Sequence, residues 1–406
     1  MQGNAVLMAI LLAAPLLTGC AALDRPDRWD LEVSLGVIVS SKLGATLDDV
    51  SSAVDLGARQ WNEMGAGIRY ILVTDAASDN AAAAYERLAQ RRVAAVIAAV
   101  PPDEAGALAQ RADQRRIPLL LVTPPSSPLS VSDMDAALQL APPVQAEADA
   151  LASLAQARNA SRAFVLHTND PYARAAAAAF DAAYGGAILQ TRAFERDAPA
   201  FLQSAARDVC ASDADSVVLF APGREAGRVV RGLVEGECRG RITVFASSAA
   251  RQLELAEEAG EDASRRSHAA GVIGVEPAAS RLGEFRALFV SETGRTPSPY
   301  AAEAYDAVSI VSLAAFRSKG SADAEPVRAT IAGGDLLPHL RDVYTSPGVK
   351  LRERAAAAEA AKRGDQLDWV GYAHDFDLTN AGAPNAAAYD QWTVTNAGTI
   401  ERVGRV

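Results

Sequence analysis

Short apolar runs typical of β-strands alternate with longer alanine-rich stretches typical of helices along most of the chain. The strand-like runs are rich in Val, Ile and Leu and are bounded by Pro, Gly or Asp, as expected for strands buried on both faces. They cover residues 31–39, 68–74, 93–100, 117–123, 162–167, 187–193, 216–221, 242–246 and 270–275. This alternation predicts an α/β fold with parallel sheets covered by helices.

A stretch rich in Pro and Ser, residues 124–143, interrupts the alternation, which then begins again. Two successive runs of βα units predict two doubly wound parallel-sheet lobes. A long helical stretch at 299–318, a polar helix at 355–362 and short strands at 369–376 and 390–395 complete the chain. With 406 residues, half of them hydrophobic, the chain is long enough to bury a core in each lobe.

The N-terminus carries the most specific local signal. Apolar residues 5–17 have the length of a signal peptide and are too few to span a bilayer as a helix. They end at Leu17-Thr18-Gly19-Cys20, which resembles the lipobox of bacterial lipoproteins. That resemblance implies a signal peptide at 1–19 and a tether at 20–30 that is lipidated on Cys20. A conventional signal peptide followed by a chance cysteine is the alternative.

Acyl chains on Cys20 would hold the protein at a membrane without a spanning helix, because no later segment approaches twenty apolar residues. In a Gram-negative cell, Ala21 lacks the aspartate that favours inner-membrane retention, which implies the periplasmic leaflet of the outer membrane. In a Gram-positive cell the anchor would lie in the plasma membrane. A net charge of −11 without a basic stripe argues against a nucleic-acid partner.

Two cysteines remain after Cys20, at positions 210 and 238. Export places them in an oxidising compartment, so we expect a disulfide between Cys210 and Cys238. In the chain-entropy description, closing that loop stabilises the fold by roughly 3.5 kcal/mol. Two buried free thiols are the alternative.

Three sets of residues resemble the type I periplasmic solute-binding proteins of the leucine/isoleucine/valine-binding family. The resemblance covers about residues 31–405. The sets are GARQ at 57–60, PSPYAAEAYDAV at 297–308, and a C-terminal series of LDWVGY at 367–372, FD at 376–377 and YDQWTV at 389–394. The second and third sets, in this order and spacing, are the more specific.

The resemblance implies two lobes joined by a hinge of three crossovers. One lobe would comprise 31–143 plus 277–372, and the other 144–276 plus 373–406. A small molecule would bind between them at the carboxyl ends of the strands, and closure of the lobes would bury it. The implied partner is an ABC permease, with no cofactor.

In the first lobe the resemblance points to Ser41, Pro102, Ser126 and Ser127 as residues that face the ligand. Ser126 and Ser127 match a family loop that holds the ligand with hydroxyls and backbone groups. The loop at Pro101-Pro102 departs from the family, because prolines lack the N–H donors that serve an anion. The serines could instead cap helices.

In the second lobe, and on the long helix, the corresponding residues are Tyr172, Arg224, Ser248 and Tyr305. In amino-acid binders a carboxylate near Ser248 holds the ammonium group, and a serine cannot replace it. We therefore expect a ligand other than a standard amino-acid zwitterion: a neutral solute, or one whose anionic group meets Arg224 or Lys42. Helical spacing also allows Tyr305 to be a core residue.

Residues for catalysis are not apparent, since the sequence holds no nucleophile elbow, phosphate-binding loop or zinc-protease motif. The four histidines lie far apart without a second ligand at metal-binding spacing, so we expect no metal site. The sequence thus favours a lipid-anchored solute-binding protein for an ABC-type importer, not an enzyme. The alternative is an envelope scaffold or regulator that uses the same fold for protein–protein contact.

Overall fold

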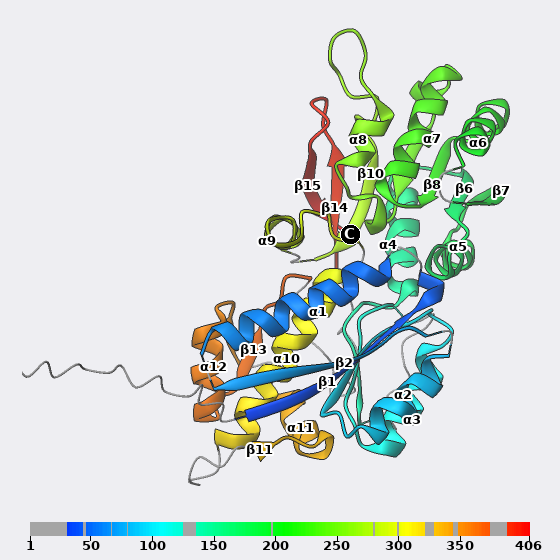
Figure 1. The fold of residues 1–406 in the computed structure, drawn as a ribbon. Helices are drawn as coiled ribbons and strands as arrows, with labels where there is room; N and C mark the ends of the chain where they lie inside the picture. Colours follow the sequence, from blue (N-terminus) through cyan, green and yellow to red (C-terminus); the bar gives the residue numbers. More distant parts are fainter. Residues whose placement is uncertain are drawn as a thin grey trace, which may run out of the picture.

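The computed structural model describes residues 31–43, 46–65, 67–78, 80–124, 135–195, 198–278, 281–298, 300–320, 329–343, 348–373 and 388–406 (Figure 1). The strands are β1 (Leu31–Ser40), β2 (Ile68–Ser78), β3 (Ala95–Ala99), β4 (Leu119–Leu121), β5 (Ala137–Gln139), β6 (Arg162–Thr168), β7 (Ala187–Phe194), β8 (Ser216–Phe220), β9 (Thr243–Ala246), β10 (Ile273–Pro277), β11 (Ala329–Thr330), β12 (Val349–Leu351), β13 (Leu367–Trp369), β14 (Tyr389–Val394) and β15 (Ile400–Arg405). The α-helices are α1 (Thr46–Glu63), α2 (Ala81–Gln90), α3 (Ala105–Arg115), α4 (Val144–Ala157), α5 (Pro171–Ala183), α6 (Pro199–Ala211), α7 (Gly223–Glu235), α8 (Glu254–Ala259), α9 (Leu282–Thr293), α10 (Ala301–Gly320), α11 (Gly333–Leu340) and α12 (Arg354–Arg363). Short 3-10 helices are η1 (Ser41–Leu43), η3 (Arg239–Arg241), η4 (Ser248–Ala250) and η5 (Arg341–Val343).

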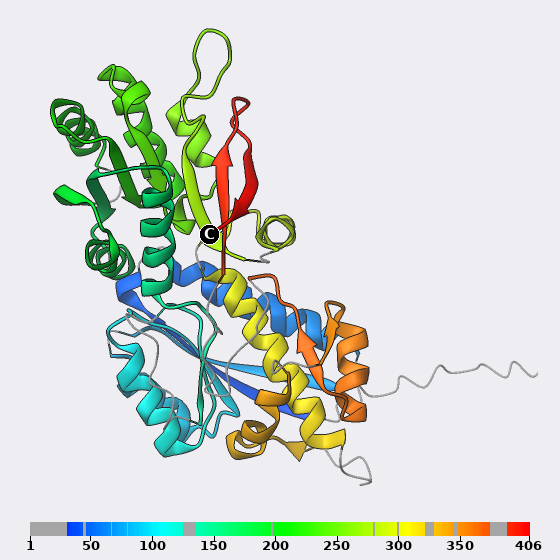
Figure 2. The same cartoon turned by 180° about the vertical axis from the view of Figure 1, so that it is seen from behind.

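The first sheet has the parallel order β2-β1-β3-β4-β5, and β11 pairs with the start of β1. Its central strands are buried along almost their whole length, because α1 and α10 cover one face and α2 and α3 the other. Figure 2 shows α10 and the β12–β13 unit from behind. We call this sheet and its helices, with α9, α11 and α12, lobe one; Phe285 and Phe289 of α9 belong to its core.

The second sheet has the order β7-β6-β8-β9-β10-β14-β15, in which β14 and β15 are antiparallel and the other strands parallel. Helices α4 and α5 cover one face, whereas α6, α7 and α8 cover the other. Gly274 of β10 lies opposite Trp392 of β14, whose ring occupies the space that a Cβ would take. We call this sheet and its helices lobe two.

The chain passes between the lobes three times: from β5 to α4, from β10 to α9, and from β13 to β14. The second and third crossovers are hydrogen-bonded to each other at both ends. The N–H of Ala278 donates to the carbonyl of Ala388 (2.8 Å), and the N–H of Arg281 donates to that of Tyr372 (2.7 Å). The predicted fold class, two doubly wound α/β lobes joined by three crossovers, is confirmed.

A buried aspartate on α10 fixes the start of the third crossover. The carboxylate of Asp306, which is fully buried, accepts a hydrogen bond from the N–H of Ala373 (2.8 Å). The guanidinium of Arg281 lies over the ring of Tyr372, 4.8 Å from its centroid. Lobe one therefore holds both crossovers through side chains of α10 and of the segment before α9.

Most predicted strands agree with the structure to within a few residues. The strand predicted at 369–376 is wrong in its bounds: β13 ends at Trp369, residues 371–373 form no strand, and 374–376 lie outside the described residues. Several elements were not predicted. The break at 124–143 contains β5, and α9, α11, β11, β12 and β15 carried no prediction. The structure joins Cys210 and Cys238 in a disulfide, with their Cα atoms 5.4 Å apart. Cys20 lies outside the described residues, and among the described ones no helix is both long and apolar enough to cross a bilayer.

Candidate functional site

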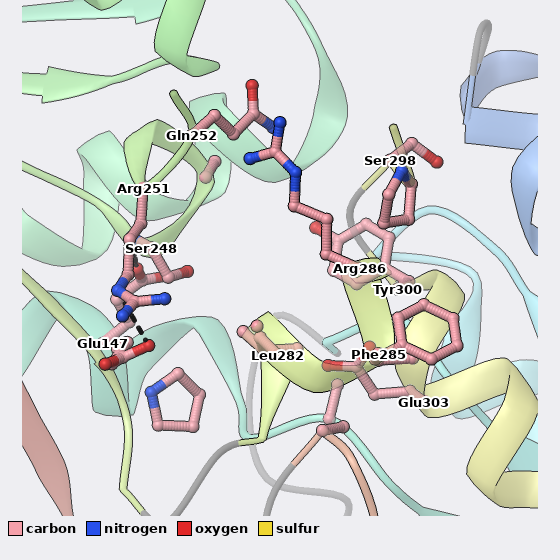
Figure 3. A pocket seen from close by; sticks show the side chains of 18 of the residues that line it. Glu147, Ser248, Arg251, Gln252, Leu282, Phe285, Arg286, Ser298, Tyr300 and Glu303 are labelled. Carbon is pink, nitrogen blue, oxygen red and sulfur yellow. Dashed lines mark hydrogen bonds and ion pairs between the residues drawn. The ribbon is translucent and has the colours of Figure 1, made fainter. Parts of the chain in front are cut away.

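A cavity of about 380 Å³ lies between the lobes and is lined by both (Figure 3). Lobe two contributes residues of α4, α5, η4 and β10, and lobe one contributes α9 and the start of α10. The polar lining residues include Glu147, Tyr172, Ser248, Arg251, Gln252, Glu276, Arg286, Ser298 and Glu303. The size suits a small organic molecule.

Glu147 of α4 supplies a buried carboxylate to the lobe-two wall. It is 4% exposed, and its two oxygens accept hydrogen bonds from the Tyr172 hydroxyl and from the N–H of Ser248 (2.5 Å). Desolvation raises the pKa of Glu147, and these hydrogen bonds only partly offset that effect. Burial also raises the pKa of Tyr172 well above its usual value, so its hydroxyl stays protonated and can donate.

A second carboxylate of lobe two, Glu276 at the end of β10, is fully buried and neutralised by arginines. Arg251 lies 3.2 Å from one carboxylate oxygen, and Arg402 lies 3.4 Å from the other. Ion pairs of this kind hold the arginine side chains in place. The Arg251–Glu276 pair is therefore part of the wall and not an open charge.

Lobe one contributes one basic and one acidic side chain, from adjacent helices. Arg286 extends from α9 into the cavity (Figure 3). Glu303 lies in the first turn of α10, and desolvation raises its pKa to about 7. Nearby Asp306 adds to that shift through charge repulsion. At neutral pH the Glu303 carboxyl group is therefore protonated about half of the time.

Between these polar groups the wall is apolar, formed by Leu282, Phe285 and Tyr300. The Tyr300 ring packs edge-on against that of Tyr172, with centroids 6.2 Å apart, so an aromatic contact joins the two lobes. Tyr300 has a φ of +72°, a left-handed conformation that is rare for a bulky residue. Such strain is often found at ligand sites.

The carboxyl ends of the parallel strands enclose a smaller cavity of about 40 Å³. Its described wall is mostly apolar and includes Leu43, Phe220, Tyr172 and Tyr300. The larger space thus lies beside this central position, against α9 and the hinge.

Of the predicted site residues, Tyr172 and Ser248 line the large cavity and are brought together by Glu147. Tyr172 also lines the small one. Ser126 and Ser127 lie outside the described residues.

The other predicted site residues are not in the wall of either cavity. Ser41 opens η1, and Pro102 is buried in the turn before α3. Neighbouring Lys42 forms an ion pair with Glu104.

Arg224 also lies away from the cavities. Its side chain is 53% exposed and lies 3.9 Å from Glu258, on the α7 surface. Tyr305 is in the core of lobe one. Its hydroxyl donates a hydrogen bond to Gln60 (2.5 Å) and accepts one from the guanidinium of Arg354. Helical spacing explains this position, because Tyr305 lies on the side of α10 that packs against α1.

Sequence reasoning missed the charged residues of the described wall, which are Glu147, Arg251, Glu276, Arg286 and Glu303. Glu147 carries a recognisable signal, because it lies on the apolar stripe of α4 with Val144, Ala148 and Leu151. A carboxylate placed there is forced into the interior and needs partners. Arg286 could not be found, since α9 itself was not predicted.

Metal binding has no support in the described part of the chain, where no group of three His, Cys, Asp or Glu side chains could hold an ion. The cavity instead offers hydrogen-bonding and charged groups around an apolar centre. This is the chemistry of reversible binding of a small organic molecule.

Structures with the same architecture include three solute-binding proteins. The leucine binding protein LivK of Thermotoga maritima has a TM-score of 0.63 and 17% identity over 92% of this chain and 98% of its own. LivJ of Streptococcus pneumoniae, in complex with isoleucine, has a TM-score of 0.62 and 18% identity over 92% and 99%. A solute binding protein of Rhodopseudomonas palustris, in complex with 3,4-dihydroxybenzoic acid, has a TM-score of 0.64 and 16% identity over 92% and 97%.

Comparison with curated protein sequences gives no match. The sequence profile described as periplasmic binding protein, however, matches residues 32–362, which is most of the chain. The two-lobed fold, the cavity between the lobes and this match lead to one conclusion: the chain belongs to the periplasmic binding protein family and has its type I, leucine-binding-protein-like fold.

Proposed function

We propose that this protein captures one small solute between its lobes and delivers it to an ABC-type importer. The observation that carries the proposal is the cavity of about 380 Å³, whose wall is shared by both lobes. A site divided in this way is complete only when the lobes are close together, so solute binding and lobe closure favour each other. The closed form then presents one composite surface to a permease.

The solute that we propose is not a standard amino-acid zwitterion. Glu147 lies where an acid could meet an ammonium group, but both of its oxygens already accept hydrogen bonds and burial disfavours its charged form. An ammonium group would therefore lack a free, fully charged carboxylate in lobe two. Proteins of this fold in complex with isoleucine and with 3,4-dihydroxybenzoic acid indicate that the scaffold accommodates solutes of different chemistry.

Attachment to a membrane through lipid on Cys20 completes the proposal. The segment LLTGC at 16–20 supports it, and so does the periplasmic character of the family. In a Gram-negative cell we place the protein at the periplasmic leaflet of the outer membrane.

Thermal-shift measurements against a broad metabolite library test the proposal. A true solute should raise the melting temperature saturably, with one molecule bound per chain. Leu282→Trp, which adds bulk to a half-buried cavity residue of α9, should reduce the shift, whereas Val290→Trp at an exposed position of the same helix should leave it intact. If no compound stabilises the wild-type protein, solute capture is rejected in favour of an envelope scaffold or regulator.

A further inference from the structure

Arg286 is the arginine of the described cavity wall whose positive charge is not neutralised by an ion pair. Among the described residues its guanidinium has one hydrogen-bonding partner, the hydroxyl of Thr296 at 3.4 Å, and no ion pair. Arg251, the other arginine in the wall, is neutralised by Glu276. A guanidinium remains charged at any pH that the protein encounters. Arg286 therefore presents a positive charge to the cavity that no described carboxylate neutralises.

The carboxyl groups of the described cavity wall do not neutralise Arg286. Glu147 accepts hydrogen bonds from Tyr172 and Ser248, and Glu276 is paired with Arg251 and Arg402. In Figure 3 the Arg286 side chain extends away from Glu303, whose protonated form is favoured by burial. The cavity thus contains one positive charge that no described acid offsets.

We propose that the solute is a small organic anion with an apolar body and that its anionic group binds Arg286. This inference rests on the proposed function and assigns the chemical class of its ligand. The anion pairs with the guanidinium through charge-assisted hydrogen bonds. Leu282, Phe285 and Tyr300 receive the apolar body.

Isothermal titration calorimetry on the purified protein tests the proposal with two matched probe series. One is benzoate, benzamide and benzylamine; the other is 3-methylbutanoate, 3-methylbutanamide and 3-methylbutylamine. We expect the carboxylate of at least one series to bind at least tenfold more tightly than its amide and amine.

Variants test the named residue. Arg286→Met should weaken carboxylate binding at least tenfold, and Arg286→Lys should weaken it less, because it keeps the charge. The matched control Arg207→Met, at an exposed position of α6 outside the cavity wall, should have no effect.

Preferential binding of an amine or amide overturns the inference while leaving solute capture intact. The same holds if Arg286→Met binds carboxylates as well as the wild type does, or if neither carboxylate binds but another compound of the metabolite library does. If neither the probes nor the library bind, the proposed function fails together with the inference.

Discussion

Glu276 and Asp390 face each other across the antiparallel strands β10 and β14, and the guanidinium of Arg402 contacts both carboxylates. The distances are 3.4 Å to Glu276 and 3.0 Å to Asp390. Two carboxylates directly opposite each other would repel across the strand pair. Arg402 therefore joins the end of β10 to the C-terminal hairpin beside the hinge.

Replacing Arg402 should leave two buried like charges undercompensated. Because its side chain is 43% exposed, we expect Arg402→Met to lower the free energy of unfolding by about 2 kcal/mol, less than for a fully buried partner. Arg405→Met is the matched control, since Arg405 contacts Asp390 alone and is 65% exposed. Urea denaturation measures both. Equal decreases in the free energy of unfolding for the two variants would show that the contact of Arg402 with both carboxylates adds no stability.

Asp306 should make stability depend on pH. Desolvation raises its pKa to about 7, so the folded protein keeps a proton on Asp306 that the unfolded chain loses near pH 4. Between these values folding takes up a proton, and the free energy of unfolding falls as pH rises. Asp306→Asn removes this contribution, so its stability relative to wild type should increase from pH 4 to 7 and then level off.

Denaturant titrations at several pH values measure this difference, with Asp55→Asn on the exposed face of α1 as the control. A difference between Asp306→Asn and wild type that does not change with pH would contradict the prediction.

The disulfide between Cys210 and Cys238 joins the end of α6 to the segment after α7. We expect the oxidised protein to show neither of these thiols when it is denatured without reductant. Reduction should lower the free energy of unfolding by about 3.5 kcal/mol through the freed loop. Thiol titration and denaturation with and without dithiothreitol measure both effects. Two free thiols in protein isolated from the cell envelope would disprove the bond.

Lipidation should depend on Cys20 alone. Cells that express the wild type should incorporate an alkyne-labelled fatty acid into the protein and retain it in the membrane fraction. Cys20→Ser should lose both properties. The double variant of Cys210 and Cys238 to serine serves as the control and should keep the label. Label on Cys20→Ser would place the anchor elsewhere.

The strands could be predicted because they are buried on both faces and therefore appear as continuous apolar runs. Residues 31–39, for example, correspond to β1 (Leu31–Ser40). By contrast, β5 (Ala137–Gln139) is too short to show any periodicity. Helix α9 buries only Phe285 and Phe289 and is otherwise exposed or half-exposed, so its sequence lacks a clear apolar stripe.

The site was harder to predict than the fold. A loop that follows a strand can be located from the sequence, whereas the wall of a cavity brings together residues from distant segments of the chain. Tyr172 and Ser248 were found from their place after strands. Glu147 and Glu303 lie in the first turns of helices, where acids commonly serve only to stabilise the helix end. Only tertiary packing shows that they line the cavity: Glu147 is hydrogen-bonded to Tyr172 and Ser248 within lobe two, and Glu303 lies in the part of the wall that lobe one contributes.

The contact between Tyr300 and Tyr172 has a consequence for the empty protein. A tyrosine with a left-handed backbone costs about 1 kcal/mol, which a glycine would avoid. Glycine, however, would provide no ring to span the gap between the halves. In the empty protein, Tyr300 then helps to set the width of the cavity entrance and so the thickness of the solute that can enter. The stiffness of the three connecting segments sets the rest.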